Sequence, residues 1–301
     1  MSEHLPSRRA RPRSVDADRP AARTIVFAHA NGFGAGTYER LFEVWRAAGY
    51  TVQAPARLGH DPRFPVASNW RGLRDELLAF IDSEVQAPPV WLVGHSLGGL
   101  LCLLAASRRP DLVRGLVILD SPVITGWRAH SVHMLKKSGL MARVSPGKVA
   151  RRRRHHWSDR AAVLRHFAGK PVFARWDPRV LADYVASGFE DLEGGGGVEL
   201  GFRREIETRI YDTLPHDIGL RLKKHPLQCP AAAILGTQSA EMRQGGTAGI
   251  RALVGERLVW IEGTHLYPME KPEATAQAVL GLLAQMVGTP YDRRGAEPAS
   301  L

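Results

Sequence analysis

Six short apolar runs are spaced along the chain, and most of them contain no alternation of apolar and polar positions. Continuously hydrophobic runs of this length are typical of strands that are buried on both faces, as in a parallel sheet. We therefore predict strands at residues 24–30, 51–55, 90–95, 115–120, 231–236 and 257–263.

Helical periodicity separates several of these runs. Apolar residues follow steps of three and four between Trp70 and Val85, and the pair Pro88-Pro89 ends that pattern. Residues 97–109 and 272–287 also predict helices, the second of which has Pro272 in its first turn. Strands that alternate with helices predict an α/β fold, a mostly parallel, doubly wound sheet with right-handed crossovers.

The alternation is interrupted between residues 121 and 229. This stretch is basic, aromatic and mostly helical in pattern, and we expect it to be a cap inserted into a core of residues 24–120 and 230–287. It is called the cap segment below. Residues 1–23 predict a disordered leader and residues 288–301 a loose tail, because both are rich in polar residues, proline and arginine.

The bulk composition narrows the class of protein. With 301 residues, 44% hydrophobic and 24% charged, the chain has the composition of a globular domain. It has no apolar stretch near the ~20 residues of a membrane-spanning helix, so no integral membrane association is expected. The leader lacks the apolar region of a secretory signal peptide. Its two cysteines, Cys102 and Cys229, have no metal-ligand spacing, and the cytoplasm is the expected location.

The positive charge is concentrated in one part of the cap segment. The formal net charge is +11, yet residues 128–179 contain fourteen Lys/Arg and two acids, which gives 14 − 2 = +12. The run "RRRRHHW" at 151–157 lies within this part. We interpret it first as a solvated helix face, with attraction of an anionic substrate or acyl carrier, or contact with an anionic membrane surface, as alternatives. Nucleic acid is not expected, since no recognition module or interleaved stacking aromatics accompany the run.

The sharpest chemical signal is "VWLVGHSLGGLLCLLAA", in which an apolar strand runs directly into Gly94-His95-Ser96-Leu97-Gly98 and then into a helix. A nucleophilic serine must project from a sharp strand-to-helix turn, and the crowded backbone there tolerates little but glycine two residues before and after it. The start of the helix also places backbone N–H groups beside the serine. This context predicts that Ser96 is a nucleophile; a structural glycine turn is the alternative.

With this motif, residues 24–287 resemble the α/β-hydrolase family, in particular serine esterases with an inserted cap. The stretch "FAHANGFGAG" resembles the family's oxyanion loop, although Ala30 replaces the expected glycine. The resemblance implies that the backbone N–H groups of Asn31 and Leu97 hold the oxyanion. A plain glycine-rich turn is the alternative.

The base is predicted near the C-terminal end of the fold. "WIEGTHLYPMEKPE" resembles the family's loop after the final strand, and it places His265 between a strand end and a helix that begins with proline. An imidazole there would take the serine proton and later protonate the leaving group.

No metal site is expected, because the adjacent pair His155-His156 lacks helical metal spacing. No cofactor is expected either.

The resemblance also implies a carboxylate that orients His265, and the sequence offers two candidates for it. The family usually has a carboxylate three residues beyond the glycine after its seventh strand, but here Gly236 is followed at that distance by Ser239. Other members of the family take the acid from the end of the sixth strand. This chain resembles them in having Asp120 at that position. We favour Asp120, keep Glu241 as the alternative acid, and expect Ser239 to support the acid or the histidine through a hydrogen bond.

The resemblance implies a serine hydrolase that acts through an acyl-enzyme on Ser96. Its expected substrate is a carboxylic ester or thioester, neutral or anionic, with a small or medium acyl chain. A non-hydrolytic enzyme of the same fold, such as a lyase or C–C bond hydrolase, and a non-catalytic binding protein are the alternatives. Five aromatic residues of the cap segment either line an acyl pocket or, as we prefer, form the core of the cap: Trp127, Trp157, Phe167, Phe173 and Trp176. Oligomeric state is not predicted.

Overall fold

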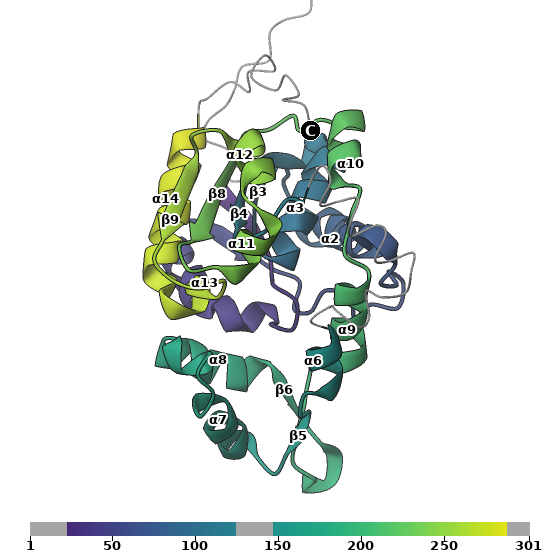
Figure 1. The fold of residues 1–301 in the computed structure, drawn as a ribbon, viewed down its shortest axis with the longest axis vertical. Helices are drawn as coiled ribbons and strands as arrows, with labels where there is room; N and C mark the ends of the chain where they lie inside the picture. Colours follow the sequence, from purple (N-terminus) through teal and green to yellow (C-terminus); the bar gives the residue numbers. More distant parts are fainter. Residues whose placement is uncertain (1–22, 125–146, 288–301) are drawn as a thin grey trace, which may run out of the picture.

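The computed structural model describes residues 23–124 and 147–287 (Figure 1). Nearly all of the predicted leader, the predicted tail, and Trp127 in the first part of the cap segment lie outside these residues. No helix in the two described ranges is long and apolar enough to span a bilayer.

A six-stranded parallel sheet forms the centre of the molecule, in the order β2-β1-β3-β4-β8-β9. All six predicted strands are present, with ends that differ by a few residues, and β1, β3 and β8 are buried along their whole length, as their continuous apolar sequences require. The strands are β1 (Thr24–Ala28), β2 (Thr51–Gln53), β3 (Val90–His95), β4 (Val113–Leu119), β8 (Ala231–Gly236) and β9 (Leu258–Ile261).

Helices cover both faces of this sheet, which confirms the predicted doubly wound α/β class (Figure 1). One face packs against α2 (Arg71–Glu84), α3 (Leu97–Arg108) and α12 (Ala248–Val254), and the other against α1 (Glu39–Ala47) and α14 (Pro272–Met286). Shorter elements complete the connections: η2 (Ala35–Tyr38), η3 (Ser68–Trp70), η4 (Pro110–Leu112), α11 (Ala240–Gly245) and α13 (Tyr267–Glu270).

The order of the strands determines where a site can form. After β1 the chain adds β2 on one side, and it then crosses over to add β3 on the other side of β1. The loops that follow β1 and β3 therefore diverge at the carboxyl edge of the sheet and leave a crevice there. The loop after β1 begins at His29, and the turn after β3 contains Ser96.

Between β4 and β8 the chain leaves the parallel sheet. A three-stranded antiparallel sheet in the order β5-β7-β6 lies here, and the sequence did not predict it because its strands are too short to show alternation. The elements are α6 (Gly147–Arg152), β5 (His156–Trp157), α7 (Arg160–Ala168), η5 (Phe173–Arg175), α8 (Pro178–Ser187), β6 (Phe189–Asp191), η6 (Glu193–Gly195), β7 (Val198–Leu200), α9 (Arg204–Asp212) and α10 (Ile218–Lys224).

These elements do not all lie on the same side of the central sheet. Helices α7 and α8 lie with β5 and β6 at one end of the molecule, whereas α10 lies beside α3 at the other end (Figure 1). Ile218 of α10 is buried in the same apolar cluster as Leu104 of α3. The boundaries of the cap segment therefore stay a prediction.

The cap aromatics pack mainly against one another. Trp157, Phe167 and Trp176 are buried, and the partly buried Phe173 packs against the same cluster. Their rings lie face to edge or tilted, as between Trp157 and Phe189 at a centroid distance of 5.2 Å. None of these four side chains lines either of the two cavities beside Ser96. These four side chains therefore form part of a hydrophobic core and do not line the cavities, while the cap itself stays a prediction.

Candidate active site

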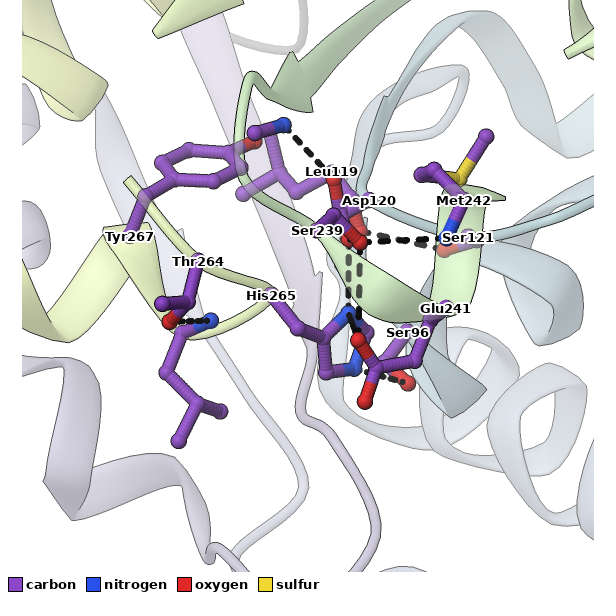
Figure 2. A network of polar contacts seen from close by, with 12 residues as sticks. Ser96, Leu119, Asp120, Ser121, Ser239, Glu241, Met242, Thr264, His265 and Tyr267 are labelled. Atoms are coloured by element: carbon purple, nitrogen blue, oxygen red, sulfur yellow. Dashed lines mark hydrogen bonds and ion pairs between the residues drawn. The ribbon is translucent and has the colours of Figure 1, made fainter. Parts of the chain in front are cut away.

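Ser96 lies in a strained turn between β3 and α3. Its φ of 53° and ψ of −112° are unusual for a residue with a side chain, and such strain persists only where the surroundings enforce it. The backbone on the two sides of Ser96 is closely packed, because a Cβ on Gly94 would lie 2.4 Å from the carbonyl oxygen of Gly98. The turn therefore requires glycine at position 94. The turn projects the Ser96 hydroxyl toward His265 (Figure 2).

His265 forms hydrogen bonds through both ring nitrogens. Its Nε2 lies 3.0 Å from the Ser96 hydroxyl, and its Nδ1 lies 2.7 Å from Oδ2 of Asp120. An ionised carboxylate can only accept, so Nδ1 carries the proton and Nε2 is free to accept the proton of Ser96. The structure thus brings Ser96, His265 and Asp120 into one hydrogen-bonded chain.

Asp120 follows β4 directly and is completely buried. Its Oδ1 accepts a hydrogen bond from the backbone N–H of Gly236 at 2.7 Å, and its Oδ2 accepts one from the Ser239 hydroxyl at 2.5 Å as well as the bond from His265. Ser239 in turn accepts a bond from the backbone N–H of Met242 as the N-cap of α11. The residue at the family's usual acid position therefore supports the carboxylate of the neighbouring strand (Figure 2).

Glu241 lies at the same site but farther from the histidine. Its Oε2 is 3.9 Å from Nδ1 of His265, too far for a hydrogen bond, and its side chain is 47% exposed. Of the two acids that the sequence left open, only Asp120 has hydrogen-bond geometry with His265 in this structure.

Among the residues that the structure describes, Asp120, Glu241 and His265 form a group that could hold a metal ion, because one ligand atom of each lies within 4.8 Å of the others. However, the hydrogen bonds with Ser96 and Asp120 already occupy both nitrogens of His265. A metal ion here would have to displace one of these bonds, so the geometry suits proton transfer better than metal binding.

The two predicted oxyanion residues, Leu97 and Asn31, lie beside Ser96. Leu97 begins α3, and Asn31 lies in the loop after β1; both line a cavity together with Ser96. Ala30, which replaces the family's glycine, does not adopt a positive φ, whereas Gly32 does, with a φ of 82°. The loop therefore takes its tight turn two residues later than the resemblance implied.

Sequence reasoning missed a buried pair behind the site, Tyr38 and His95. The Tyr38 hydroxyl accepts a hydrogen bond from the backbone N–H of Ala30 and lies 2.8 Å from Nδ1 of His95, whose Nε2 lies 2.9 Å from the carbonyl oxygen of His265. A carbonyl only accepts, so Nε2 carries the proton and Tyr38 donates to Nδ1. This pair connects the oxyanion loop with the histidine loop. No local sequence pattern around Tyr38 or His95 predicted this pair.

Two cavities meet at Ser96 and His265. One has a volume of about 390 Å³ and a mainly apolar wall that includes Trp70, Leu100 and Ile210. The other, of about 360 Å³, is more polar and is bordered by Arg175 and Gln238. Both volumes lie within the ~300–1,000 Å³ of small-molecule sites. The site can therefore receive a substrate with two different ends.

A buried histidine at the start of the predicted oxyanion loop, His29, is expected to make stability depend on pH. His29 Nε2 accepts a hydrogen bond from the backbone N–H of Leu58 at 2.7 Å, and burial lowers the pKa of His29 from 6.5 to about 4. Below pH 6.5 the unfolded chain binds the proton first, so the free energy of unfolding should fall as the pH drops toward 4. At about 1.4 kcal/mol per pKa unit, His29 alone contributes a loss of about 3 kcal/mol.

Urea unfolding at several pH values measures this loss. In His29→Gln, the amide oxygen can still accept from Leu58 but cannot titrate, and the remaining groups stay the same. We expect the decline between pH 6.5 and 4 to be smaller in this variant by about 3 kcal/mol. Equal declines in the two proteins would show that His29 does not carry the effect.

Comparison with known proteins agrees with this architecture. The model of the alpha/beta hydrolase family matches residues 25–278. Phospholipase YtpA of Bacillus subtilis is 34% identical over 114 residues, which is 36% of this chain but only 43% of that relative. The putative carbamate hydrolase RutD of Rhizobium rhizogenes is 27% identical over 189 residues, 52% of this chain and 69% of that one.

Solved structures of low sequence identity share the fold. The crystal structure of E-2-(acetamidomethylene)succinate hydrolase superposes with a TM-score of 0.67 at 21% identity, and it covers 87% of this chain and 91% of its own. A thioesterase domain from the curacin biosynthetic pathway gives 0.63 at 18% identity, with 87% and 92% covered. Because the family model spans most of the chain, this protein belongs to the alpha/beta hydrolase family.

Proposed function

We propose that the protein is a serine hydrolase that cleaves a carboxylic ester or thioester through an acyl-enzyme on Ser96. The observation that carries this proposal is the hydrogen-bonded chain from Ser96 through His265 to the buried Asp120, which opens onto two cavities. The names of two relatives, a phospholipase and a putative carbamate hydrolase, are consistent with acyl transfer to water.

In the proposed mechanism, each residue has one role. Ser96 attacks the acyl carbonyl while Nε2 of His265 takes its proton, and Asp120 stabilises the imidazolium that forms. The backbone N–H groups of Leu97 and Asn31 stabilise the oxyanion. His265 then protonates the leaving group, and water, activated by the same imidazole, releases the acid from Ser96.

The two cavities suggest how a substrate would lie. The apolar cavity would accept the acyl chain, and the more polar cavity the alcohol or thiol. Glu241 borders both cavities, and its carboxylate would repel a negative group placed near His265. We therefore propose an acyl group without charge, in preference to the anionic substrate that the basic run suggested.

A fluorophosphonate probe tests the proposal. We expect a covalent adduct on the peptide that contains Ser96, detected by mass spectrometry, because only an activated serine attacks this phosphorus centre at an appreciable rate. A panel of p-nitrophenyl esters and acyl thioesters then tests hydrolysis. Absence of the adduct would refute the serine mechanism, while an adduct without turnover of any ester would favour a non-hydrolytic enzyme of the same fold.

A further inference from the structure

The arginine run at 151–154 is not a uniformly solvated face. The Arg151 side chain is 63% exposed, whereas that of Arg153, two residues later, is only 17% exposed. Arg153 Nη1 donates to Oε2 of Glu207 at 2.7 Å, and the carboxylate that accepts this bond is itself 9% exposed. The most conspicuous motif of the sequence thus contributes one arginine to the interior.

Glu207, on α9, contacts the predicted oxyanion loop in two ways. Its backbone carbonyl accepts a hydrogen bond from Nδ2 of Asn31 at 3.0 Å. Its carboxylate lies against the next residue, because a Cβ built on Gly32 would be 2.9 Å from Oε1 of Glu207 and 3.4 Å from Nη1 of Arg153. The ion pair therefore packs directly on the backbone that carries the Asn31 N–H group.

Arg153 has a second buried partner that contacts the same loop. Its Nη2 donates to the hydroxyl of Tyr184, on α8, at 2.9 Å. The Tyr184 ring lies 5.7 Å from that of Phe33, centroid to centroid. One guanidinium thus joins α8 and α9, and both of its partners pack on residues 31–33.

We propose that Arg153 and Glu207 form a positioning pair that holds the Asn31–Phe33 loop where the Asn31 N–H group can stabilise the oxyanion. A buried ion pair tolerates little displacement, because each charge loses its compensation when the other moves. The catalytic consequence rests on the proposed function, whereas the effect on the loop does not. Through this pair the cap segment and the oxyanion loop move as one unit.

The experiment compares Arg153→Met with Arg152→Met, a matched change at the exposed neighbour in the same run. We expect Arg153→Met to lower kcat for a p-nitrophenyl ester about tenfold with KM unchanged, within the ~10²-fold that a 1 Å misplacement can cost. Arg152→Met should keep the wild-type kcat. A wild-type kcat in Arg153→Met would overturn the catalytic part of the proposal.

A double variant separates positioning from stability. Arg153→Met leaves the Glu207 carboxylate buried without its partner, and adding Glu207→Gln removes that uncompensated charge. If the pair serves stability alone, the double variant should recover both Tm and kcat. We expect it to recover Tm while kcat stays low; recovery of both would contradict a positioning role.

Hydrogen–deuterium exchange gives a readout that does not depend on catalysis. The backbone N–H groups of Phe33 and Ala35 are bonded to the carbonyls of Ala30 and Ala56, so their exchange reports on the loop. We expect faster exchange in a peptide covering 29–36 for Arg153→Met than for Arg152→Met. Equal rates would refute the proposal even if the fluorophosphonate probe had labelled Ser96, and faster exchange would support the coupling even if it had not.

Discussion

Replacing Asp120 by asparagine should lower kcat by about 10⁴-fold, the size of loss measured when the aspartate of another serine hydrolase's triad is neutralised. The amide keeps the shape of the side chain, and its oxygen can still accept from Gly236 or Ser239. It cannot stabilise the imidazolium of His265, and an NH₂ group facing Nδ1 favours the tautomer in which Nε2 cannot accept the Ser96 proton. Steady-state kinetics with an ester that the wild type hydrolyses measures the effect.

Glu241→Gln is the matched control, since it neutralises the other carboxylate at the same site. Glu241 is half-exposed and lies 3.9 Å from Nδ1 of His265, so solvent screens its charge and we expect a loss of less than about tenfold. Near-wild-type turnover in Asp120→Asn together with a large loss in Glu241→Gln would move the acid to Glu241. Circular dichroism and Tm of both variants would show that each is folded.

The choice between Asp120 and Glu241 shows which part of the candidate site can be predicted from the sequence and which part cannot. The resemblance to the α/β-hydrolase family, together with the common edge at which parallel strands end, limited the acid to Asp120 and Glu241. The decision depends on contacts that join residues 120, 239 and 265, which no local pattern encodes. Ser239 caps α11 and donates to Asp120, the carboxylate that lies within hydrogen-bond distance of His265.

The centre of the sheet was predictable because β1, β3 and β8 are buried along their whole length and are therefore apolar throughout. The burial of Arg153 was not predictable. A run of four arginines has the same sequence pattern whether or not one of them pairs with a carboxylate 54 positions away. Likewise, β5 has only two residues, and its place depends on pairing with β7. Short and long-range features of this kind are set by tertiary contacts that periodicity cannot report.

The second large effect is expected at Gly98, the second residue of α3. A Cβ at this position would lie 1.9 Å from the carbonyl oxygen of Ala28 and 2.8 Å from that of His29. These atoms belong to the end of β1 and the start of the oxyanion loop, so they cannot yield without displacing Asn31. We expect Gly98→Ala to lower the free energy of unfolding by about 3 kcal/mol or more, the upper range for overpacking, and kcat by about 10²-fold.

Gly281→Ala is the control for this change, because Gly281 also lies within a helix, α14, but a Cβ there would meet nothing within 4 Å. This substitution should raise the free energy of unfolding by about 0.4–1 kcal/mol, since alanine has fewer conformations to lose on folding. Urea unfolding and kcat of both variants measure the contrast. If the free energy of unfolding falls in Gly98→Ala and rises in Gly281→Ala, contact with β1, and not helix propensity, requires glycine at position 98. If Gly98→Ala were as stable and active as Gly281→Ala, the close approach of α3 to β1 would not be what holds the oxyanion loop beside Ser96.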